Sequence, residues 1–404
     1  MHCRSVRAFR SSRAVAVVLV TVAMFTDLVA YSIAVPVLPD LGQRLGASPT
    51  TLGLLFASFG VTLLMVSMPM GAISDRVGRK GPLVGGLVAL AASTLSFALV
   101  GTLGGLFAAR LAQGAADAVT WVVGLALIAD LYGPADRGRV MGMVMAGAGV
   151  GLMIGPSIGG WLYELGGTRL PFAVVATIAA ADAAAFMWLR IPERHADRER
   201  LPIAAVILVP AIASCAAAVF SAAATISMLE PVLPLFLSSK LGLGPARIGF
   251  VFGAGAVVST LLNPVSGRMS HRFGARRLTM TGLLLIACVL PLLTLAWSFQ
   301  SALALYALQA ATFALAVTPS LAYMAEATSD AGLGSFGVTY GLYNVAWGAG
   351  LLGGPALGGF LFERLGFSGL TLVWAPVAIV ITLGLARIGR PAPETAPYRF
   401  PPRS

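Results

Sequence analysis

Long apolar stretches dominate this chain, and short segments with charged, Pro or Gly residues separate them. Most stretches have about 20 residues or more, which is the length that a helix needs to cross the hydrocarbon layer of a membrane. The pattern predicts twelve spanning helices near residues 14–38, 50–73, 83–101, 104–131, 139–164, 170–190, 203–237, 246–269, 278–298, 301–325, 334–362 and 368–386. We therefore expect an all-α membrane protein.

The composition supports the same fold class. Of the 404 residues, 58% are apolar and only 11% are charged. A soluble domain carries about 25% charged residues, and its apolar residues come in short periodic runs. The composition therefore excludes an ordinary soluble protein.

The two halves of the chain nearly repeat each other. A glycine-rich stretch with Gly155, Pro156, Gly159, Gly160 and Glu164 returns 199 positions later as Gly354, Pro355, Gly358, Gly359 and Glu363. Duplicated helical halves are typical of membrane transporters. We predict two pseudo-symmetric six-helix halves, 14–190 and 203–388, a cytoplasmic linker, 191–202, and cytoplasmic tails, 1–13 and 389–404.

The basic residues predict the orientation. Apart from Arg110, five basic residues fall on one side, namely Arg44, Arg169, Lys240, Arg247 and Arg364, whereas the other 21 of the 27 Lys and Arg residues fall on the opposite side. Short basic loops stay in the cytoplasm during insertion, so both termini are expected there, in a multi-pass protein of the cell membrane. Because the net charge of +11 is spread over these loops, no nucleic-acid partner is expected.

Cysteine and histidine offer no reactive centre. Cys3, Cys215 and Cys288 do not have the spacing of a disulfide framework or a metal site, and no histidine falls within a predicted span. We therefore expect no cofactor, no metal and no enzymatic activity.

The turn between the second and third spans carries a motif with Gly71, Asp75, Arg76, Gly78 and Arg79. A two-residue turn needs a flexible glycine, and an aspartate at a helix end can bind a helix N-terminus or an arginine. The motif resembles the signature loop of the major facilitator superfamily. This resemblance implies that the loop latches the outward-facing state.

The fifth span carries a stripe of small residues at every fourth position, which lets another backbone approach closely. The stripe consists of Gly147, Gly151, Gly155 and Gly159, and Pro156 and Gly160 complete the motif. It resembles the motif that distinguishes antiporters within the same superfamily. Simple helix packing and an additional sealing of a leak pathway both remain open.

Three charged residues, Asp27, Arg110 and Glu230, lie far from the ends of their predicted spans. A charge at the bilayer centre costs about 3 kcal/mol or more, so such a residue normally faces a cavity or a partner. A buried carboxyl group can hold a proton or release it to bind a cation. We interpret Asp27 and Glu230 as substrate and proton sites, and Arg110 as either a coupling or a structural residue.

Other acids in the spans are weaker candidates. Asp182 is either a polar contact or a second proton site, and Asp117 is a further buried acid. Asp130, near the cytoplasmic end of its span, is interpreted as a solvated helix end.

The eleventh span has an aromatic and amide stripe on one face, with Tyr340, Tyr343, Asn344 and Trp347. Aromatic faces attract organic cations, so the stripe is either a cavity wall or core packing. Trp121 has the same two interpretations.

Nearly the whole chain resembles vesicular amine transporters and bacterial drug exporters. The resemblance rests on Asp27, residues 35–39, Ala109, Arg110, Gln113, Gly114, residues 137–142, Met228, Leu229, Glu230, Pro231 and Pro234. It implies that Asp27 and Glu230 bind the substrate amine and protons, and that Arg110 supports the proton pathway. The chain departs from the vesicular members at Phe59 and Asn344, which replace an ion pair, and near Ala314, which replaces an aspartate.

These observations together predict a monomeric, proton-coupled antiporter that exports a lipophilic, cationic small molecule and is surrounded by membrane lipids. A uniporter or symporter for a neutral solute such as a sugar is one alternative. A receptor or scaffold that does not transport is another.

Overall fold

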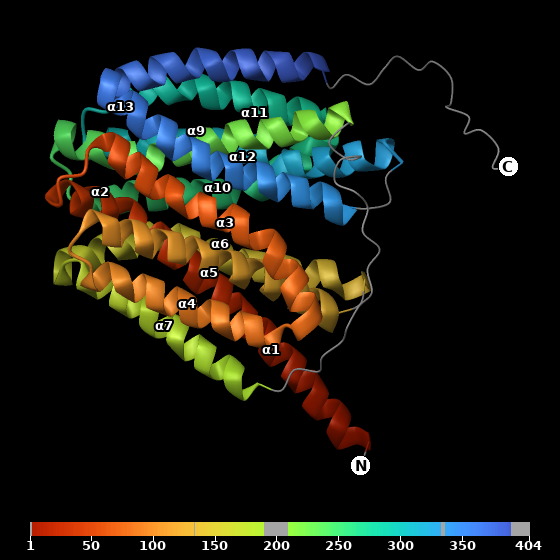
Figure 1. The fold of residues 1–404 in the computed structure, drawn as a ribbon. Helices are drawn as coiled ribbons and strands as arrows, with labels where there is room; N and C mark the ends of the chain where they lie inside the picture. The colour runs from red at the N-terminus through yellow and green to blue at the C-terminus, as the bar shows by residue number, and fades with distance from the viewer. Residues whose placement is uncertain (1, 133, 190–208, 333–335, 389–404) are drawn as a thin grey trace, which may run out of the picture.

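The computed structural model describes residues 2–132, 134–189, 209–332 and 336–388, which are helical apart from short connections (Figure 1). The expected linker 191–202 and tail 389–404 lie outside these residues. The first half contains α1 (His2–Ser32), α2 (Ala34–Arg44), α3 (Pro49–Val77), α4 (Lys80–Leu99), α5 (Leu103–Leu131), α6 (Pro134–Gly166) and α7 (Arg169–Trp188). The second contains α9 (Pro210–Leu241), α10 (Pro245–Phe273), α11 (Ala275–Val289), η1 (Leu290–Leu295), α12 (Phe299–Asp330) and α13 (Phe336–Ile388).

The described helices account for the twelve predicted crossings. Eleven segments within them are long and apolar enough to span a membrane, and the last, within α13, extends over 50 residues. Gly366 interrupts α13 with a φ of 67°, which divides it into two helices, 336–365 and 367–388. The two parts of α13, light and dark blue in Figure 1, turn back on each other. α1 already begins at His2, so residues 2–13 are helical.

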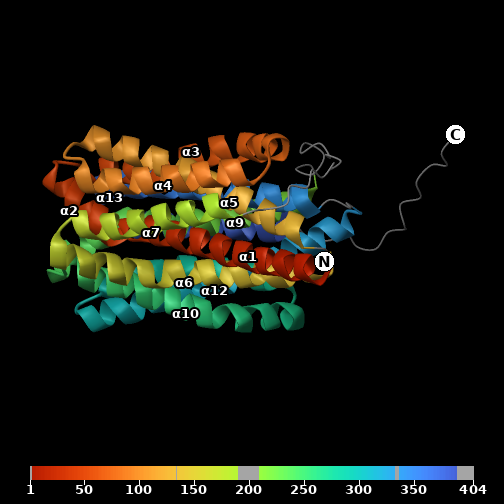
Figure 2. The same ribbon diagram turned by 90° about the horizontal axis from the view of Figure 1, so that it is seen from below.

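Most long helices lie side by side along one common direction, which Figure 2 shows from a second side. Local sequence explains where they begin. Pro49 occupies the first turn of α3 after the capping Ser48, and Thr102 and Ser298 cap α5 and α12 in the same way. Such caps satisfy backbone N–H groups that have no partner within the helix.

The turn predicted between the second and third spans is confirmed. α3 ends at Val77 and α4 begins at Lys80, and Gly78 between them has a φ of 87°. The repeated position, Gly274, joins α10 to α11 with a φ of 86°. Glycine adopts these left-handed angles without a steric penalty, which other residues cannot do.

Two equivalent glutamates connect the halves. Glu363 Oε2 accepts hydrogen bonds from Thr50 N and from Ser48 Oγ, both at 2.8 Å, at the start of α3. Glu164 Oε1 accepts one from Ala246 N at 3.0 Å, at the start of α10. Each half therefore caps a helix of the other half with the same residue of the repeat, where a negative charge meets a helix N-terminus.

The glycine stripe of α6 makes the close approach that its spacing predicts. A Cβ atom added at Gly159 would lie 2.7 Å from Ile33 Cβ, and one at Gly151 would meet the Phe25 carbonyl oxygen. Gly155 faces Ser32 in the same manner. α6 therefore packs backbone to backbone along α1.

Glycines also bring the two halves together. A Cβ atom at Gly160 of α6 would clash with the Pro245 carbonyl oxygen at the start of α10. A Cβ atom added at its repeat partner, Gly359 of α13, would clash with the Pro49 carbonyl oxygen and would lie 2.9 Å from Gly53 Cα. The end of the molecule that carries the glutamate caps is therefore also closed by these contacts.

We expect Gly359→Val to destabilise the folded protein by about 1–3 kcal/mol, because its side chain must push α3 away from α13. Gly85→Val is the matched control, since no atom lies within 4 Å of a Cβ added there. Thermal unfolding in detergent measures both variants. Equal melting temperatures for the two would contradict the close approach.

Candidate substrate and proton site

Asp27 lies near the C-terminal end of α1, in the middle of the membrane span Arg13–Arg44, and is 1% exposed. Its carboxylate accepts a hydrogen bond of 2.7 Å from the indole Nε1 of Trp121 on α5. Asp117, one helical turn before Trp121, is 7% exposed, and its carboxyl group lies next to that of Asp27. The indole therefore lies beside two neighbouring acids.

Arg110 is fully buried on α5. Its Nη1 donates a hydrogen bond of 2.7 Å to Gln113 Oε1. The guanidinium carbon lies 5.0 Å from the ring centre of Tyr31, 5.2 Å from that of Phe56 and 4.8 Å from that of Phe59. These aromatic faces stabilise the cation electrostatically.

Glu230 of α9 is bound by a residue of the other half. The hydroxyl of Tyr31 on α1 contacts both carboxylate oxygens of Glu230, at 2.8 and 2.7 Å. The same Tyr31 ring faces Arg110. Tyr31 therefore links the cation of the first half to the acid of the second.

One face of α5 builds most of this site. Arg110, Gln113, Asp117 and Trp121 follow one another at spacings of three and four residues, so they share a side of the helix. From the sequence, Tyr31 and Gln113 had no predicted role, and Asp117 was only a weak candidate. The regular spacing from Arg110 was the signal that could have identified Asp117 and Trp121.

The acids have no bound countercharge. Among the described residues, neither Asp27 nor Glu230 takes part in a salt bridge, and no group of three or more His, Cys, Asp or Glu residues could hold a metal ion. Each carboxyl group is held by an aromatic donor instead. The arrangement can therefore exchange a proton for another cation without first breaking an ion pair.

Asp182 of α7 stands apart from this site. It is 4% exposed, and neither of its carboxyl oxygens has a hydrogen-bond partner within the described residues. The structure therefore provides none of the polar contacts that one interpretation required. Its role as a proton site stays a prediction.

The predicted aromatic stripe lies in a different cluster. Tyr343 is 7% exposed and its hydroxyl is 3.0 Å from Ser320 Oγ, whereas Trp347 packs against Phe313 with ring centres 6.0 Å apart. Both belong to the cluster of the second half that also contains Cys215, and Asn344 is exposed. The structure thus does not place these residues in contact with Asp27 or Glu230, and their role in binding stays a prediction.

The signature loop forms an ionic cluster at the end of α3. Arg79 contacts Asp75 at 2.5 Å and Asp130 of α5 at 2.8 Å, and it donates to Ser74 Oγ at 2.6 Å. The interpretation of Asp130 as a solvated helix end is wrong, because its side chain is only 8% exposed. Burial opposes the charge of Arg79, but hydrogen bonds and the charges of Asp130 and Asp75 outweigh it and raise the pKa of Arg79.

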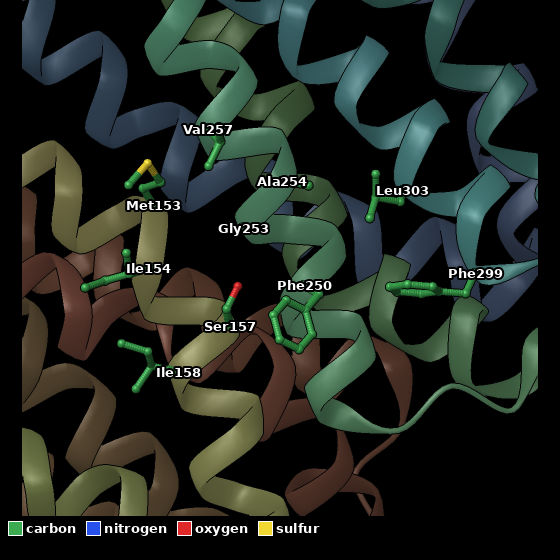
Figure 3. A pocket seen from close by; sticks show the side chains of 10 residues that line it. All are labelled: Met153, Ile154, Ser157, Ile158, Phe250, Gly253, Ala254, Val257, Phe299 and Leu303. Carbon is green, nitrogen blue, oxygen red and sulfur yellow. The ribbon is translucent and has the colours of Figure 1, made fainter.

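A separate hollow of about 640 Å³ lies between α6, α10 and α12 (Figure 3). Its walls are almost entirely apolar, and Ile158, Phe250 and Val257 are more than a third exposed. The hollow opens on the outside of the bundle and contains none of the acids above. It is therefore distinct from the candidate site.

A bundle of two similar helical halves, with acids buried within it, defines the class of multi-pass membrane proteins built like transporters. The family model of the Major Facilitator Superfamily matches residues 20–213 and 215–404. The chain belongs to this superfamily, which confirms the predicted fold.

The relatives include vesicular transporters. The chain is 29% identical over 378 residues to a probable vesicular acetylcholine transporter-B of Danio rerio, covering 89% of this chain and 76% of that protein. It is 26% identical over 334 residues to the human chromaffin granule amine transporter, covering 82% of this chain but less than two thirds, 64%, of that protein. The predicted resemblance to vesicular amine transporters is confirmed.

Solved structures show the same fold at lower identity. A bacterial homologue of the human lysosomal transporter Spinster, in an inward-facing and unoccupied conformation, has a TM-score of 0.81 and 15% identity, over 95% of this chain and 99% of that one. The human organic anion transporter MFSD10 has a TM-score of 0.66 and 18% identity, over 92% and 99%.

We expect Tyr31→Phe to destabilise the protein by about 1–3 kcal/mol, because Glu230 then loses its hydrogen-bond donor across the two halves. Tyr132→Phe serves as the control, since Tyr132 follows the last residue of α5, eleven positions after Trp121. Thermal unfolding in detergent provides the measurement. A Tyr31→Phe variant as stable as the control would show that this contact between the halves contributes little.

Proposed function

We propose that the protein is a proton-coupled antiporter that exports a hydrophobic, cationic small molecule, such as a lipophilic amine, by alternating access. It acts as a monomer in the cell membrane, with both termini in the cytoplasm and lipids around its apolar faces. Protons and the organic cation compete for the same buried acids. Because the site opens to only one side of the membrane at a time, a gradient of either cation drives the other in the opposite direction.

The observation that carries this proposal is the state of the two acids. Asp27 and Glu230 come from opposite halves, lie within membrane-spanning helices, and are bound by Trp121 and Tyr31 rather than by a cation. A carboxylate in such surroundings favours a positive partner, because the cost of its charge is otherwise large. An organic cation and a proton both meet this need.

The names of the relatives support the class of substrate. They are acetylcholine and amine transporters, so their printed substrates carry a positively charged nitrogen. Tyr31 links the buried Arg110 to Glu230, which supports a role of Arg110 in coupling. We further propose that the loop of Gly71, Asp75, Arg76, Gly78 and Arg79 latches one conformation, and that the α6 stripe seals the pathway.

The test is transport in proteoliposomes of wild type, Asp27→Asn and Glu230→Gln. An imposed pH gradient should drive uptake or release of a lipophilic amine, and reversing the gradient should reverse the flux. Each neutral variant loses a charged contact of about 1.5–3 kcal/mol, so gradient-driven flux should fall about tenfold or more.

Asp330→Asn is the matched control, because Asp330 is an exposed acid at the end of α12. It should transport like the wild type. Flux that ignores the direction of the pH gradient would exclude proton exchange. Wild-type flux in both neutral variants would exclude the proposed site.

A further inference from the structure

Asp117 introduces a second acid directly beside Asp27. The two side chains are 7% and 1% exposed, and their carboxyl groups lie next to each other. Trp121 donates to Asp27 at 2.7 Å. Trp121 follows Asp117 by four residues, so both point from the same face of α5 towards α1.

Two buried acids so close together favour a shared proton. An ionised carboxylate only accepts hydrogen bonds, so two carboxyl groups can bond to each other only when one of them is protonated. Two ionised carboxylates side by side in a buried site would repel each other strongly. Within the described part of the chain neither acid forms a salt bridge that would offset this repulsion.

The same face of α5 holds unused donors. Arg110 and Gln113 are at most 1% exposed, and Arg110 Nε, Arg110 Nη2 and Gln113 Nε2 have no hydrogen-bond partner in the described residues. The charge of Arg110 acts on Asp117 as well as on Glu230. Arg110 therefore provides a positive charge near Asp117 when Asp117 loses its proton.

The other titratable groups around the pair are few. Tyr31 and Glu230 approach from α1 and α9, and the charge of Asp117 acts on Tyr31. On α7, which packs against α1, the acid is Asp182. The part of α6 that faces α1 presents its glycine stripe, and α3 presents Phe56 and Phe59 to Arg110.

We propose that Asp117 is a proton-binding partner of Asp27: the two carboxyl groups hold one proton between them, and an organic cation that reaches the pair displaces it. The released proton passes to water. The pair then carries two negative charges, of which the organic cation offsets one and Arg110 faces the other. This inference rests on the proposed exchange function and adds a residue to it.

The first experiment needs no ligand. Infrared spectra of the purified protein in detergent at neutral pH should contain a protonated-carboxyl C=O band that Asp117→Asn loses and Asp117→Glu keeps, because only an acid at position 117 can share the proton. Asp330→Asn, an exposed acid, should leave the band unchanged. A band of equal strength in Asp117→Asn would overturn the proposal.

The second experiment counts protons during binding. Tetraphenylphosphonium is a suitable probe, since it is a lipophilic cation with no proton of its own. In weakly buffered detergent, the wild type and Asp117→Glu should release about one proton per bound cation, and Asp117→Asn should release less than about half as much. Equal release by Asp117→Asn and wild type would overturn the role of Asp117.

These measurements distinguish a failure of the shared-proton pair from a failure of the proposed proton exchange. If the wild type binds the probe without any proton release, the proposed proton exchange itself is wrong, whatever the infrared band shows. If the wild type releases a proton and Asp117→Asn does so equally, exchange stands and only the shared-proton pair fails. If the wild type does not bind the probe, the proposed class of substrate is wrong.

Discussion

A buried acid in a membrane protein is stable only when protein groups replace the water that it has lost. The site depends on this constraint. Trp121 supplies a donor to Asp27, and Tyr31 supplies one to Glu230. Because an aromatic donor balances only part of the charge, each acid keeps its affinity for a proton or a cation. A lysine or arginine in the same place would have neutralised the acid permanently.

Protein groups likewise balance only part of the charge of Arg110. Arg110 rests among the rings of Tyr31, Phe56 and Phe59 and bonds only Gln113 among the described residues. These rings carry no net charge, so they stabilise Arg110 without neutralising it.

The duplication explains how the halves meet. Glu164 and Glu363 cap helices of the opposite half, and Gly160 and Gly359 lie against the backbone next to these caps. A contact that joins two equivalent surfaces must occur twice, once for each copy. Separation of the halves at this end would therefore expose both helix starts.

Several features of the fold could be predicted because they depend on local chemistry. The length of each apolar run predicted the spans, and Gly78 predicted a tight turn. The four-residue spacing of the glycines from Gly147 to Gly159 predicted a close approach of helices. Asp130 was misjudged, since its position near a helix end suggested water whereas Arg79 of the adjacent loop binds it. The aromatic residues around Tyr343 were similarly ambiguous, because helical spacing shows that residues share a face and not what that face meets.

The sequence by itself determined that the chain crosses the membrane about twelve times, that its halves are copies, and which acids cannot be ordinary surface residues. Hydropathy and repetition carry this information, since both are properties of the chain read in order. Only the tertiary structure decided the partners: Trp121 is 94 positions from Asp27, and Glu230 is 199 from Tyr31. Such contacts depend on the rotation and register of packed helices. The shapes of all side chains along the interface determine these, and no single motif encodes them.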